Sequence, residues 1–502
     1  MTVTPDLEER LAIALVAQRL RAGAEAALES PPEPLADADV DADACLTALV
    51  EQLALTRDPS LAWLIVTLLA GAYPTAQDLR HLLRVRDLED VPDLTLAILD
   101  RARHVALVHG VQRPARVVTG VVVDVDMSAR VDLHNGIQRV VREIVNVWWA
   151  GHDLTLAAWT SPAGSLRTLT SDEEDRAVRW GRTPRHPTYP DTAARADAIT
   201  ELLVPWHATV VLAEVPLSDR CPRMAGLAEM SGSEVVGIGY DAIPFVSADL
   251  RPFGEPNAFA SYLTVVKYAK RIASISSSSQ AEFGGYVDAL AAQGLRGPDV
   301  SLVVQPATVP PAPDGYVRHE PERPLVVIVG RLEPHKNHTA LLAATERLWR
   351  EGLRFDLKII GTHGWHTERV ERQLEQLREL EASVEWMRGV GDDELWQLLR
   401  DASFTVFISL HEGFGLPVAE SLACGTPVLT TNYGSQAEIA QGGGALTVDP
   451  RDDASVLAGL RAMLTDRFLV ERLRAEAKEY PVQTWKQYAD DVWSQLVPGR
   501  PR

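Results

Sequence analysis

The stretch FTVFISLHEGFGLPVAESLACGTPVLTTNYGSQAE, residues 404–438, decides the fold of this chain. Its first seven residues, 404–410, are apolar and rich in β-forming side chains, so we expect a buried strand. A glycine-containing loop follows at 411–416, and Pro417 suits the first turn of a helix, where the missing N–H costs no hydrogen bond. A Gly-Thr-Pro sequence ends this helix before the next strand, 427–431. Strand, glycine loop, helix and strand in this order indicate a parallel α/β sheet.

The loop of this stretch has chemistry that suits a phosphate flanked by hydroxyl groups. Gly413 and Gly415 allow the backbone to approach a ligand closely, and the start of the following helix offers unpaired N–H groups and a positive dipole end. Glu412 precedes the helix and Glu420 lies on its first turn or just after, so both carboxylates can face one crevice. Carboxylates are poor phosphate ligands but accept hydrogen bonds from sugar hydroxyls. The simplest ligand with a phosphate in the middle and hydroxyls at both ends is a nucleotide sugar.

The composition indicates a soluble globular protein of two or three domains. The chain has 502 residues, 46% of them hydrophobic and 24% charged, and its formal net charge of −20 argues against a nucleic-acid partner. Cys45, Cys221 and Cys424 are too far apart for a disulfide framework or a zinc site, which favours a reducing cytoplasm. The first residues lack a signal-peptide pattern, and the longest apolar run, 61–72, is too short to span a bilayer. We expect that run to form a buried helix.

Residues 1–112 differ from the rest of the chain. They show helical apolar spacing and prolines, with no strand pattern and no chemical motif. An acidic, proline-containing joint is expected at 31–44. We therefore expect an all-α accessory domain that mediates protein contacts or oligomerisation. Its expected helices are 7–28, 45–56, 60–72, 75–86 and 93–109.

The remainder alternates strands with helices, which predicts parallel sheets covered by helices on both faces. A proline-rich joint near 306–323 separates two such series, so we expect two Rossmann-like domains, 113–312 and 313–480, facing a cleft, and a final helix in 481–502. Ligands in such sheets bind at the carboxyl ends of the strands. The expected strands are 117–126, 154–160, 209–213, 234–240, 271–276, 301–305, 324–330, 355–361, 384–388, 404–410, 427–431 and 445–448.

Two motifs in the first of these domains could contact a ligand, although each also has a plain structural interpretation. Gly136 follows Asn135 at the start of a helix, where it could admit a phosphate or a sugar or simply form the helix entry. Tyr240 and Asp241 end an apolar strand before a proline turn, where Asp241 could meet a ligand or only cap that turn.

A third motif, GRLEPHKNH at 330–338, places cations at a strand end of the second domain. Gly330 ends the strand, Arg331 follows it, and Lys336 lies just before the next helix. Both cations could point into one crevice, where they would neutralise a diphosphate and stabilise it as a leaving group.

Together, these motifs resemble those of the retaining GT-B glycosyltransferases of family 4. The resemblance covers about residues 117–495 and implies two Rossmann-like domains that close on a nucleotide-sugar donor. A Tyr-Asp-x-Ile-Pro sequence, in place of the His-Asp of many members, resembles the mannosyltransferase-like subgroup, so GDP-mannose is the first expectation for the donor. The matching segments are NGIQR (135–139), YDAIP (240–244), GRLEPHKNH (330–338), GTHGW (361–365) and HEGFGLPVAESLACGTPV (411–428).

The resemblance also implies roles for individual residues. Arg331 and Lys336 would bind the donor diphosphate, Glu412 the transferred sugar and Glu420 the ribose hydroxyls. The loop formed by Gly413, Phe414, Gly415 and Leu416 would present backbone N–H groups. Gly136, Tyr240, Asp241 and Gly330 would complete the donor site. The implied chemistry is front-face attack with retained configuration and an oxocarbenium-like transition state, in which the departing diphosphate takes the acceptor proton.

One sequence feature points to different chemistry. Asp124 and Asp126 form an Asp-x-Asp pair of the kind that binds a metal in another glycosyltransferase fold, but they end a strand of an alternating domain without the rest of that pattern. We therefore expect no metal and no resident cofactor.

The sequence as a whole predicts a metal-independent retaining hexosyltransferase. Its expected partners are a nucleotide sugar and a saccharide or lipid-linked acceptor, and an acceptor at the inner membrane face leaves a peripheral membrane contact open. Donors such as UDP-glucose, UDP-N-acetylglucosamine and dTDP-rhamnose also stay open. The alternatives are a catalytically silent scaffold that acts through its helical domain, and a phosphorylase or epimerase of the same fold.

Overall fold

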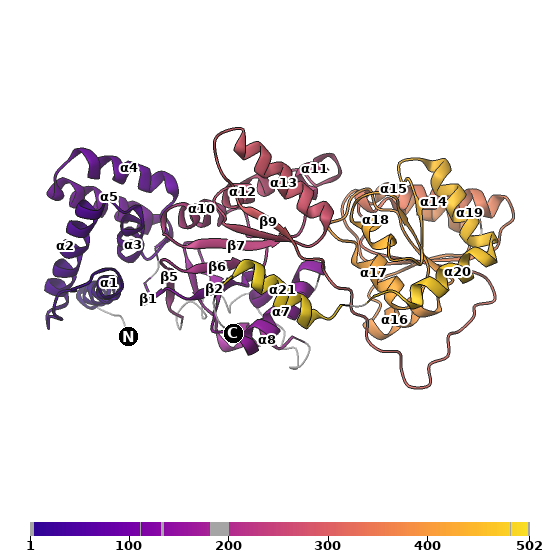
Figure 1. Cartoon of the computed structure of the whole chain (residues 1–502), viewed down its shortest axis with the longest axis horizontal. Coiled ribbons are helices and arrows are strands. Elements are labelled where there is room, and N and C mark those ends of the chain that lie inside the picture. Colours follow the sequence, from indigo (N-terminus) through magenta and orange to yellow (C-terminus); the bar gives the residue numbers. More distant parts are fainter. Residues whose placement is uncertain are drawn as a thin grey trace.

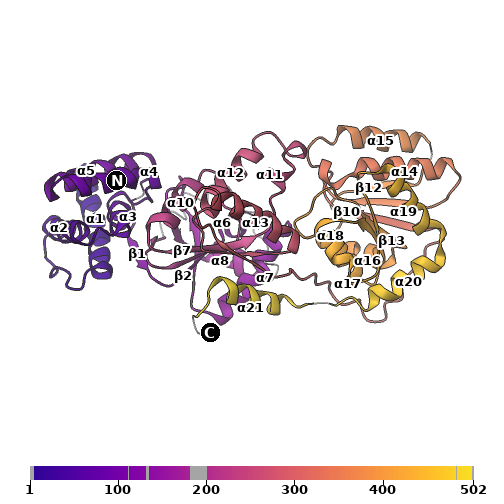
Figure 2. The same ribbon diagram turned by 45° about the horizontal axis from the view of Figure 1, so that its top comes forward.

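The computed structural model describes residues 5–110, 112–131, 135–180, 200–380, 382–481 and 483–499. Three parts follow one another along the long axis of the molecule: a helical domain at one end, an α/β lobe in the middle and a second α/β lobe at the other end (Figures 1 and 2). None of the helices in these ranges is long and apolar enough to cross a membrane.

The helical domain has five helices, four of which pack around the apolar helix α3, whose residues 60–68 are buried. The expected joint at 31–44 is wrong in its second half, because α2 already begins at Ala38. Asp37 caps that helix by accepting hydrogen bonds from the backbone N–H groups of Asp39 and Val40. Acidic side chains stabilise a helix start, so the acidic run extends the helix instead of breaking it. The helices are α1 (Pro5–Ala27), α2 (Ala38–Thr56), α3 (Pro59–Ala70), α4 (Ala76–Leu88) and α5 (Val91–His109).

The middle lobe, which we call the N-lobe, contains a nine-stranded sheet in the order β1-β5-β4-β3-β2-β6-β7-β8-β9. The single strand expected at 117–126 is two strands that lie apart in this sheet. All pairs are parallel except those of the short strand β4, which is antiparallel to β3 and β5. Its strands are β1 (Ala115–Val118), β2 (Val121–Asp124), β3 (Thr155–Trp159), β4 (Leu166–Thr168), β5 (Leu202–Pro205), β6 (Thr209–Leu212), β7 (Glu234–Gly239), β8 (Arg271–Ser274) and β9 (Asp299–Leu302).

Helices cover the N-lobe sheet and connect its strands. They are α6 (Asp126–Arg130), α7 (Gly136–Gly151), α8 (Ser171–Val178), α10 (Cys221–Met230), α11 (Ile243–Val246), a 3₁₀ turn (Ala248–Leu250), α12 (Glu255–Val266) and α13 (Ser277–Ala291). Of these, α11 and α13 begin shortly after the strands β7 and β8, at the edge of the sheet that faces the second lobe (Figure 2).

The second lobe, which we call the C-lobe, has a six-stranded sheet in the order β12-β11-β10-β13-β14-β15, with every pair parallel. This is the strand order of a doubly wound Rossmann-type domain. Successive strands are added on one side of β10 as far as β12 and then on its other side from β13 onward, so the strand order reverses between β10 and β13. Ligands bind at the carboxyl ends of the strands at this reversal point. The strands are β10 (Leu325–Val329), β11 (Asp356–Ile360), β12 (Val384–Met387), β13 (Phe404–Phe407), β14 (Val428–Thr431) and β15 (Ala445–Val448).

The C-lobe helices lie on both sides of this sheet, and the chain then returns to the N-lobe. They are a 3₁₀ turn (Pro334–Lys336), α14 (His338–Arg350), α15 (Glu368–Glu379), α16 (Asp392–Asp401), α17 (Leu416–Ala423), α18 (Gly434–Ala440), α19 (Asp453–Thr465) and α20 (Arg467–Lys478). The last helix of the chain is α21 (Trp485–Leu496). Figure 1 shows α21, in yellow, lying against the N-lobe. The indole Nε1 of Trp148 on α7 donates to the carbonyl of Ala489 at 2.8 Å, which fastens this helix in place.

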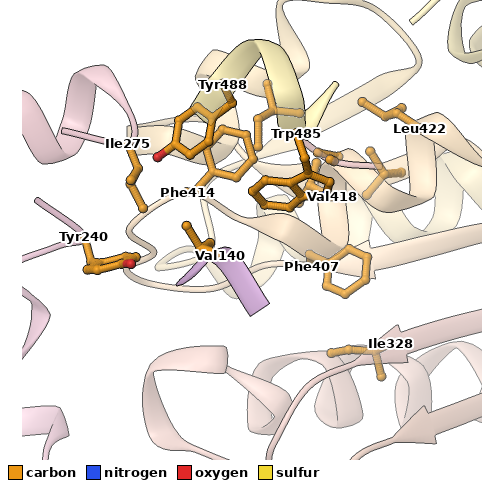
Figure 3. Close-up of a cluster of buried hydrophobic side chains, with 14 of the residues drawn as sticks. Val140, Tyr240, Ile275, Ile328, Phe407, Phe414, Val418, Leu422, Trp485 and Tyr488 are labelled. Carbon is orange, nitrogen blue, oxygen red and sulfur yellow. The ribbon is translucent and has the colours of Figure 1, made fainter. Parts of the chain in front are cut away.

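One continuous cluster of buried apolar side chains joins the two lobes. Figure 3 shows Phe414 of the C-lobe beside Tyr488 of α21, with Val140 of α7 close by. Phe414 is 7% exposed, so this side chain anchors its loop between the lobes.

Candidate active site

The loops after β10 and β13 meet at the reversal point of the C-lobe sheet. The carbonyl of His335 accepts a hydrogen bond from the backbone N–H of Leu410 at 2.7 Å, which holds the two loops together. Across this junction the Nζ of Lys336 lies 2.5 Å from Oε1 of Glu412. The predicted lysine and the predicted carboxylate, 76 residues apart in the chain, are therefore in direct contact.

The ion pair sets the charge of Glu412. Burial alone would raise the pKa of this carboxyl, but the charge of Lys336, the neighbouring His335 and the hydrogen bonds from Lys336 and Ser409 together outweigh it, and the pKa lies below its ordinary value. Glu412 is therefore an anion at neutral pH. His335, buried next to Lys336, has its pKa lowered to about 3 and is neutral. A carboxylate held ionised in this way can accept hydrogen bonds from sugar hydroxyls but cannot act as a general acid.

Arg331 reaches the same junction from the end of β10, with a side chain that is 59% exposed. Its guanidinium lies 3.5 Å from Oε1 of Glu333 and 5.9 Å from the ring centre of Trp365. Both Arg331 and Lys336 are close enough to Glu333 to lower its pKa, although burial outweighs them and the net shift is upward. The two predicted cations thus flank one side chain, and the guanidinium of Arg331 also donates to the carbonyl of His363 at 3.4 Å.

Glycines shape the backbone beneath these cations. Gly361, at the end of β11, has φ 156°, and a Cβ there would stand 2.0 Å from the carbonyl oxygen of Gly330. Gly330 itself has φ 150°, with no atom within 4 Å of a would-be Cβ. The chain turns out of the sheet at this point through conformations that other residues rarely adopt.

The start of α17 offers backbone donors next to the ion pair. Gly415 has φ 100° and forms the N-cap, and α17 begins at Leu416, one residue before Pro417. Within the described part of the chain, the N–H groups of Phe414, Gly415 and Leu416 have no hydrogen-bond acceptor. Three free donors at a helix start, with Lys336 nearby, form an anion-binding surface.

Glu420 lies on the next turn of α17 and is paired with the opposite lobe. Its carboxylate forms an ion pair with Arg139 of α7, whose second guanidinium nitrogen donates to the carbonyl of Thr308 at 2.8 Å. Burial raises the pKa of Glu420 and outweighs the effect of Arg139. Arg139 lies in the NGIQR motif, but the motif predicted no role for it. Its chemistry as a cation at a helix start was the signal that could have identified it.

Gly136 approaches the C-lobe from the N-lobe. A Cβ at this position would lie 3.8 Å from Cδ1 of Leu416, an ordinary contact, so Gly136 and the start of α17 are neighbours across the lobes. Asn135 caps α7 by accepting from the N–H groups of Ile137 and Gln138. The turn at Asn135 and Gly136 therefore forms the entry to helix α7 and also lies next to the C-lobe.

Tyr240 and Asp241 contribute to the cleft in different ways. The hydroxyl of Tyr240 donates to the carbonyl of Ala213 at 2.7 Å, and the side chain is 4% exposed in the apolar cluster of Figure 3. Its backbone carbonyl lies next to Gly413 of the C-lobe. Asp241 is buried beside Gly413, and burial raises its pKa to about 6. Its Oδ1 also accepts from the N–H of Ile243, the first residue of α11.

Polar contacts that the sequence did not predict also cross the lobe junction. His411 contacts Ser247 and Glu282, the Oγ of Ser276 donates to the carbonyl of Gly413, and Glu438 accepts from the N–H groups at the start of α13. Only the serine run at 276–279 carried a signal, because serines favour a helix start.

Asp124 and Asp126 are occupied by protein donors. Asp124 accepts from the indole N–H of Trp159 at 3.0 Å, and Asp126 accepts from the backbone N–H of Trp159 and from Arg220. Burial raises the pKa of Asp124 to about 7. Among the described residues, no group of three histidine, cysteine or acidic side chains is arranged to hold a metal ion.

Residues 317–480, the C-lobe with the junctions just described, match the family model of the Glycosyl transferases group 1. The serotype-specific mannosyltransferase WbdA of Escherichia coli is 36% identical over 118 residues, which is 24% of this chain and 14% of that protein. The O-antigen chain mannosyltransferase B of Escherichia coli is 33% identical over 157 residues, 30% of this chain and 41% of that protein. The chain thus matches less than half of either relative.

The fold extends beyond that match. A crystal structure of Anabaena HepE in complex with UDP and glucose aligns with a TM-score of 0.51 at 12% identity, over 75% of this chain and 99% of that one. The likeness includes both α/β lobes and confirms the predicted architecture of two Rossmann-like domains, with a helical N-terminal region outside it.

Proposed function

We propose that this protein is a glycosyltransferase that moves a hexosyl group from a nucleotide sugar to a saccharide acceptor. The observation that carries the proposal is the contact between Lys336 and Glu412 beside the free N–H groups at the start of α17. A cation and helix-start donors suit a diphosphate, and an ionised carboxylate next to them suits sugar hydroxyls. A nucleotide sugar has both groups in that order.

Each of the four charged residues has its own role in the proposed reaction. Lys336 and Arg331 neutralise the diphosphate as the bond between the anomeric carbon and the phosphate oxygen breaks. Glu412 holds the hydroxyls of the transferred sugar, and Glu420 takes the ribose hydroxyls. The acceptor hydroxyl attacks on the face from which the diphosphate leaves, and its proton passes to the departing phosphate oxygen, so the configuration is retained. The charge that a metal ion would supply comes from the two basic side chains.

The donor is GDP-mannose in this proposal. Its support is the Tyr-Asp-x-Ile-Pro sequence and the printed names of the two Escherichia coli relatives, both mannosyltransferases. The acceptor is a glycan or a lipid-linked saccharide, reached from the N-lobe side of the cleft. The helical domain would mediate contacts with other proteins, and the chain would work in the cytoplasm at the inner membrane face.

The test is release of nucleoside diphosphate from a panel of nucleotide sugars, with and without saccharide acceptors, in the presence of EDTA. Lys336→Ala should lower kcat by about 10²–10³-fold, the effect of removing one donor that stabilises transition-state charge. Lys358→Ala is the matched control, because Lys358 forms an exposed ion pair with Glu385 on the same lobe.

Each outcome of this assay decides between functions. Turnover that is insensitive to Lys336→Ala contradicts the mechanism, and loss of turnover with EDTA contradicts its independence of metal. Release of a sugar phosphate from a glycan and inorganic phosphate would indicate a phosphorylase. A wild-type protein that binds no nucleotide sugar in a thermal-shift assay and turns over none would be a scaffold.

A further inference from the structure

His411 immediately precedes Glu412 and is the one histidine of the deciding stretch. Its ring lies between two elements of the opposite lobe. Nδ1 is 2.8 Å from Oγ of Ser247, at the end of α11, and Nε2 is 2.5 Å from Oε1 of Glu282 on α13. Because both ring nitrogens have acceptors, the imidazolium form satisfies the whole site by donating two hydrogen bonds.

Glu282 is itself held in place by the turn that carries Asp241. Its second oxygen, Oε2, accepts from the backbone N–H of Ala242 at 2.6 Å. A chain of bonds therefore runs from the loop that carries Glu412, through His411 and Glu282, to the turn after Tyr240. The side chains of His411 and Glu282 are 13% and 15% exposed, so water competes weakly for these bonds.

The charges around His411 come from every element packed against it. Asp241 follows β7, Glu282 lies on α13, and Glu412 is the next residue in its own loop, while Lys336 and the neutral His335 lie on the loop after β10. Burial would lower the pKa of His411, but the bond to Glu282 and the charges of the three carboxylates outweigh it. The net shift raises the pKa above its ordinary value of 6.5.

We propose that His411 is a positioning residue: its ion pair with Glu282 clamps the N-lobe onto the loop that carries Glu412 and fixes the lobe spacing in which that carboxylate meets the donor sugar. This inference rests on the proposed function for its link to catalysis. The clamp itself is a property of the lobe contact and can be measured without a substrate.

The clamp has a defined pH dependence. The folded state raises the pKa of His411, so the contact is fully formed below pH 6.5 and is lost as the pH rises through the folded-state pKa. The lobes should part on the alkaline side. A second cross-lobe contact, in which Glu438 accepts from the N–H groups of Ser277 and Ser278 at 2.9 Å and 2.8 Å, contains no histidine and offers a matched control.

Two variants test the clamp against the wild type. His411→Gln can keep one hydrogen bond but has no charge, and Glu282→Gln keeps the acceptor for Ala242 while removing the carboxylate that raises the histidine pKa. Glu438→Gln is the control variant. For each protein we would measure kcat and KM for the nucleotide sugar, and the radius of gyration by small-angle X-ray scattering without ligand, from pH 6 to 9.

The expected result is an alkaline fall in kcat and an alkaline rise in the radius of gyration for wild type and Glu438→Gln. In Glu282→Gln the same transition should move to lower pH by about one unit, a tenfold weaker preference for the charged imidazole. His411→Gln should lack the transition, with kcat lowered about tenfold at pH 6.5. A purely structural histidine would lower the melting temperature without moving the pH profile.

The inference is overturned if His411→Gln keeps the wild-type pH profile and radius of gyration, or if Glu282→Gln leaves the transition where it is. Should His411→Gln fail to fold, the shift in Glu282→Gln decides alone. If the wild type turns over no nucleotide sugar, the proposed function fails, and the scattering measurements still accept or reject the clamp.

Discussion

The substitution Gly413→Ala should drive the two lobes apart. An added Cβ would stand 2.8 Å from the carbonyl oxygen of Tyr240 and 2.9 Å from Oδ2 of Asp241, whereas ordinary contacts begin at 3.4 Å. The closest group is backbone and cannot swing away. The φ of Gly413 is not in the left-handed region, so alanine brings no backbone strain of its own. The whole effect of the methyl group therefore falls on the contact between the lobes.

The size of that effect follows from the overlap. Overpacking by one methyl group in a tight contact costs about 1–3 kcal/mol. Because the two sides belong to different lobes, separation of the lobes relieves the overlap. The cost therefore appears in the closing equilibrium, where about 1–3 kcal/mol lowers the equilibrium constant for closure roughly 5- to 150-fold.

The assay combines turnover with thermal unfolding. We expect Gly413→Ala to lower kcat/KM by the factor just given and to change the melting temperature by only a few degrees. Gly285→Ala on α13 is the control, since an added Cβ there meets no atom within 4 Å. Activity of Gly413→Ala within twofold of wild type, with unchanged small-angle scattering, would refute the reasoning that these two backbones must touch for catalysis.

Two further predictions separate site residues from structural ones. Gly136→Ala adds a methyl group with room around it at the first residue of α7, so the protein should gain up to about 1 kcal/mol of stability. If the donor passes over Gly136, its KM should nevertheless rise about tenfold, and an unchanged KM would remove this glycine from the donor site. Tyr240→Phe removes the bond to Ala213 and should cost about 1 kcal/mol in unfolding free energy while turnover stays within twofold. A tenfold loss of kcat with an unchanged melting curve would instead place the Tyr240 hydroxyl on the substrate.

Much of the C-lobe could be predicted from the sequence because its strands are apolar runs bounded by glycine and proline. Every strand expected there exists, with ends within two to three residues of the prediction. The N-lobe was harder to predict. β4, Leu166–Thr168, has only three residues and pairs antiparallel, so it lacks the length of the other strands in the sheet. The split of 117–126 depends on a turn at residues 119–120 whose two strands then go to separate places in the sheet.

Some contacts of the site could likewise be predicted from the sequence, and others could not. The contact between Lys336 and Glu412 could be expected because both residues follow strands that are adjacent at the reversal point of one sheet. The contact between His411 and Glu282 could not, since it depends on how the two lobes sit against each other. No periodicity or spacing within either lobe encodes that arrangement.

Glu412 and Glu420 consequently differ in where the cation that pairs with them lies. Glu412 has its cation, Lys336, within the C-lobe, so its ionised state survives any movement of the lobes. Glu420 is paired with Arg139 of the N-lobe, so separation of the lobes removes that cation and admits water to the carboxylate. Under the proposed function, the sugar-binding carboxylate is therefore ready in every lobe arrangement, whereas the ribose-binding one is matched to the closed form. Lobe closure is therefore a condition for holding the nucleotide end of the donor, in addition to setting the lobe spacing at the sugar end through His411.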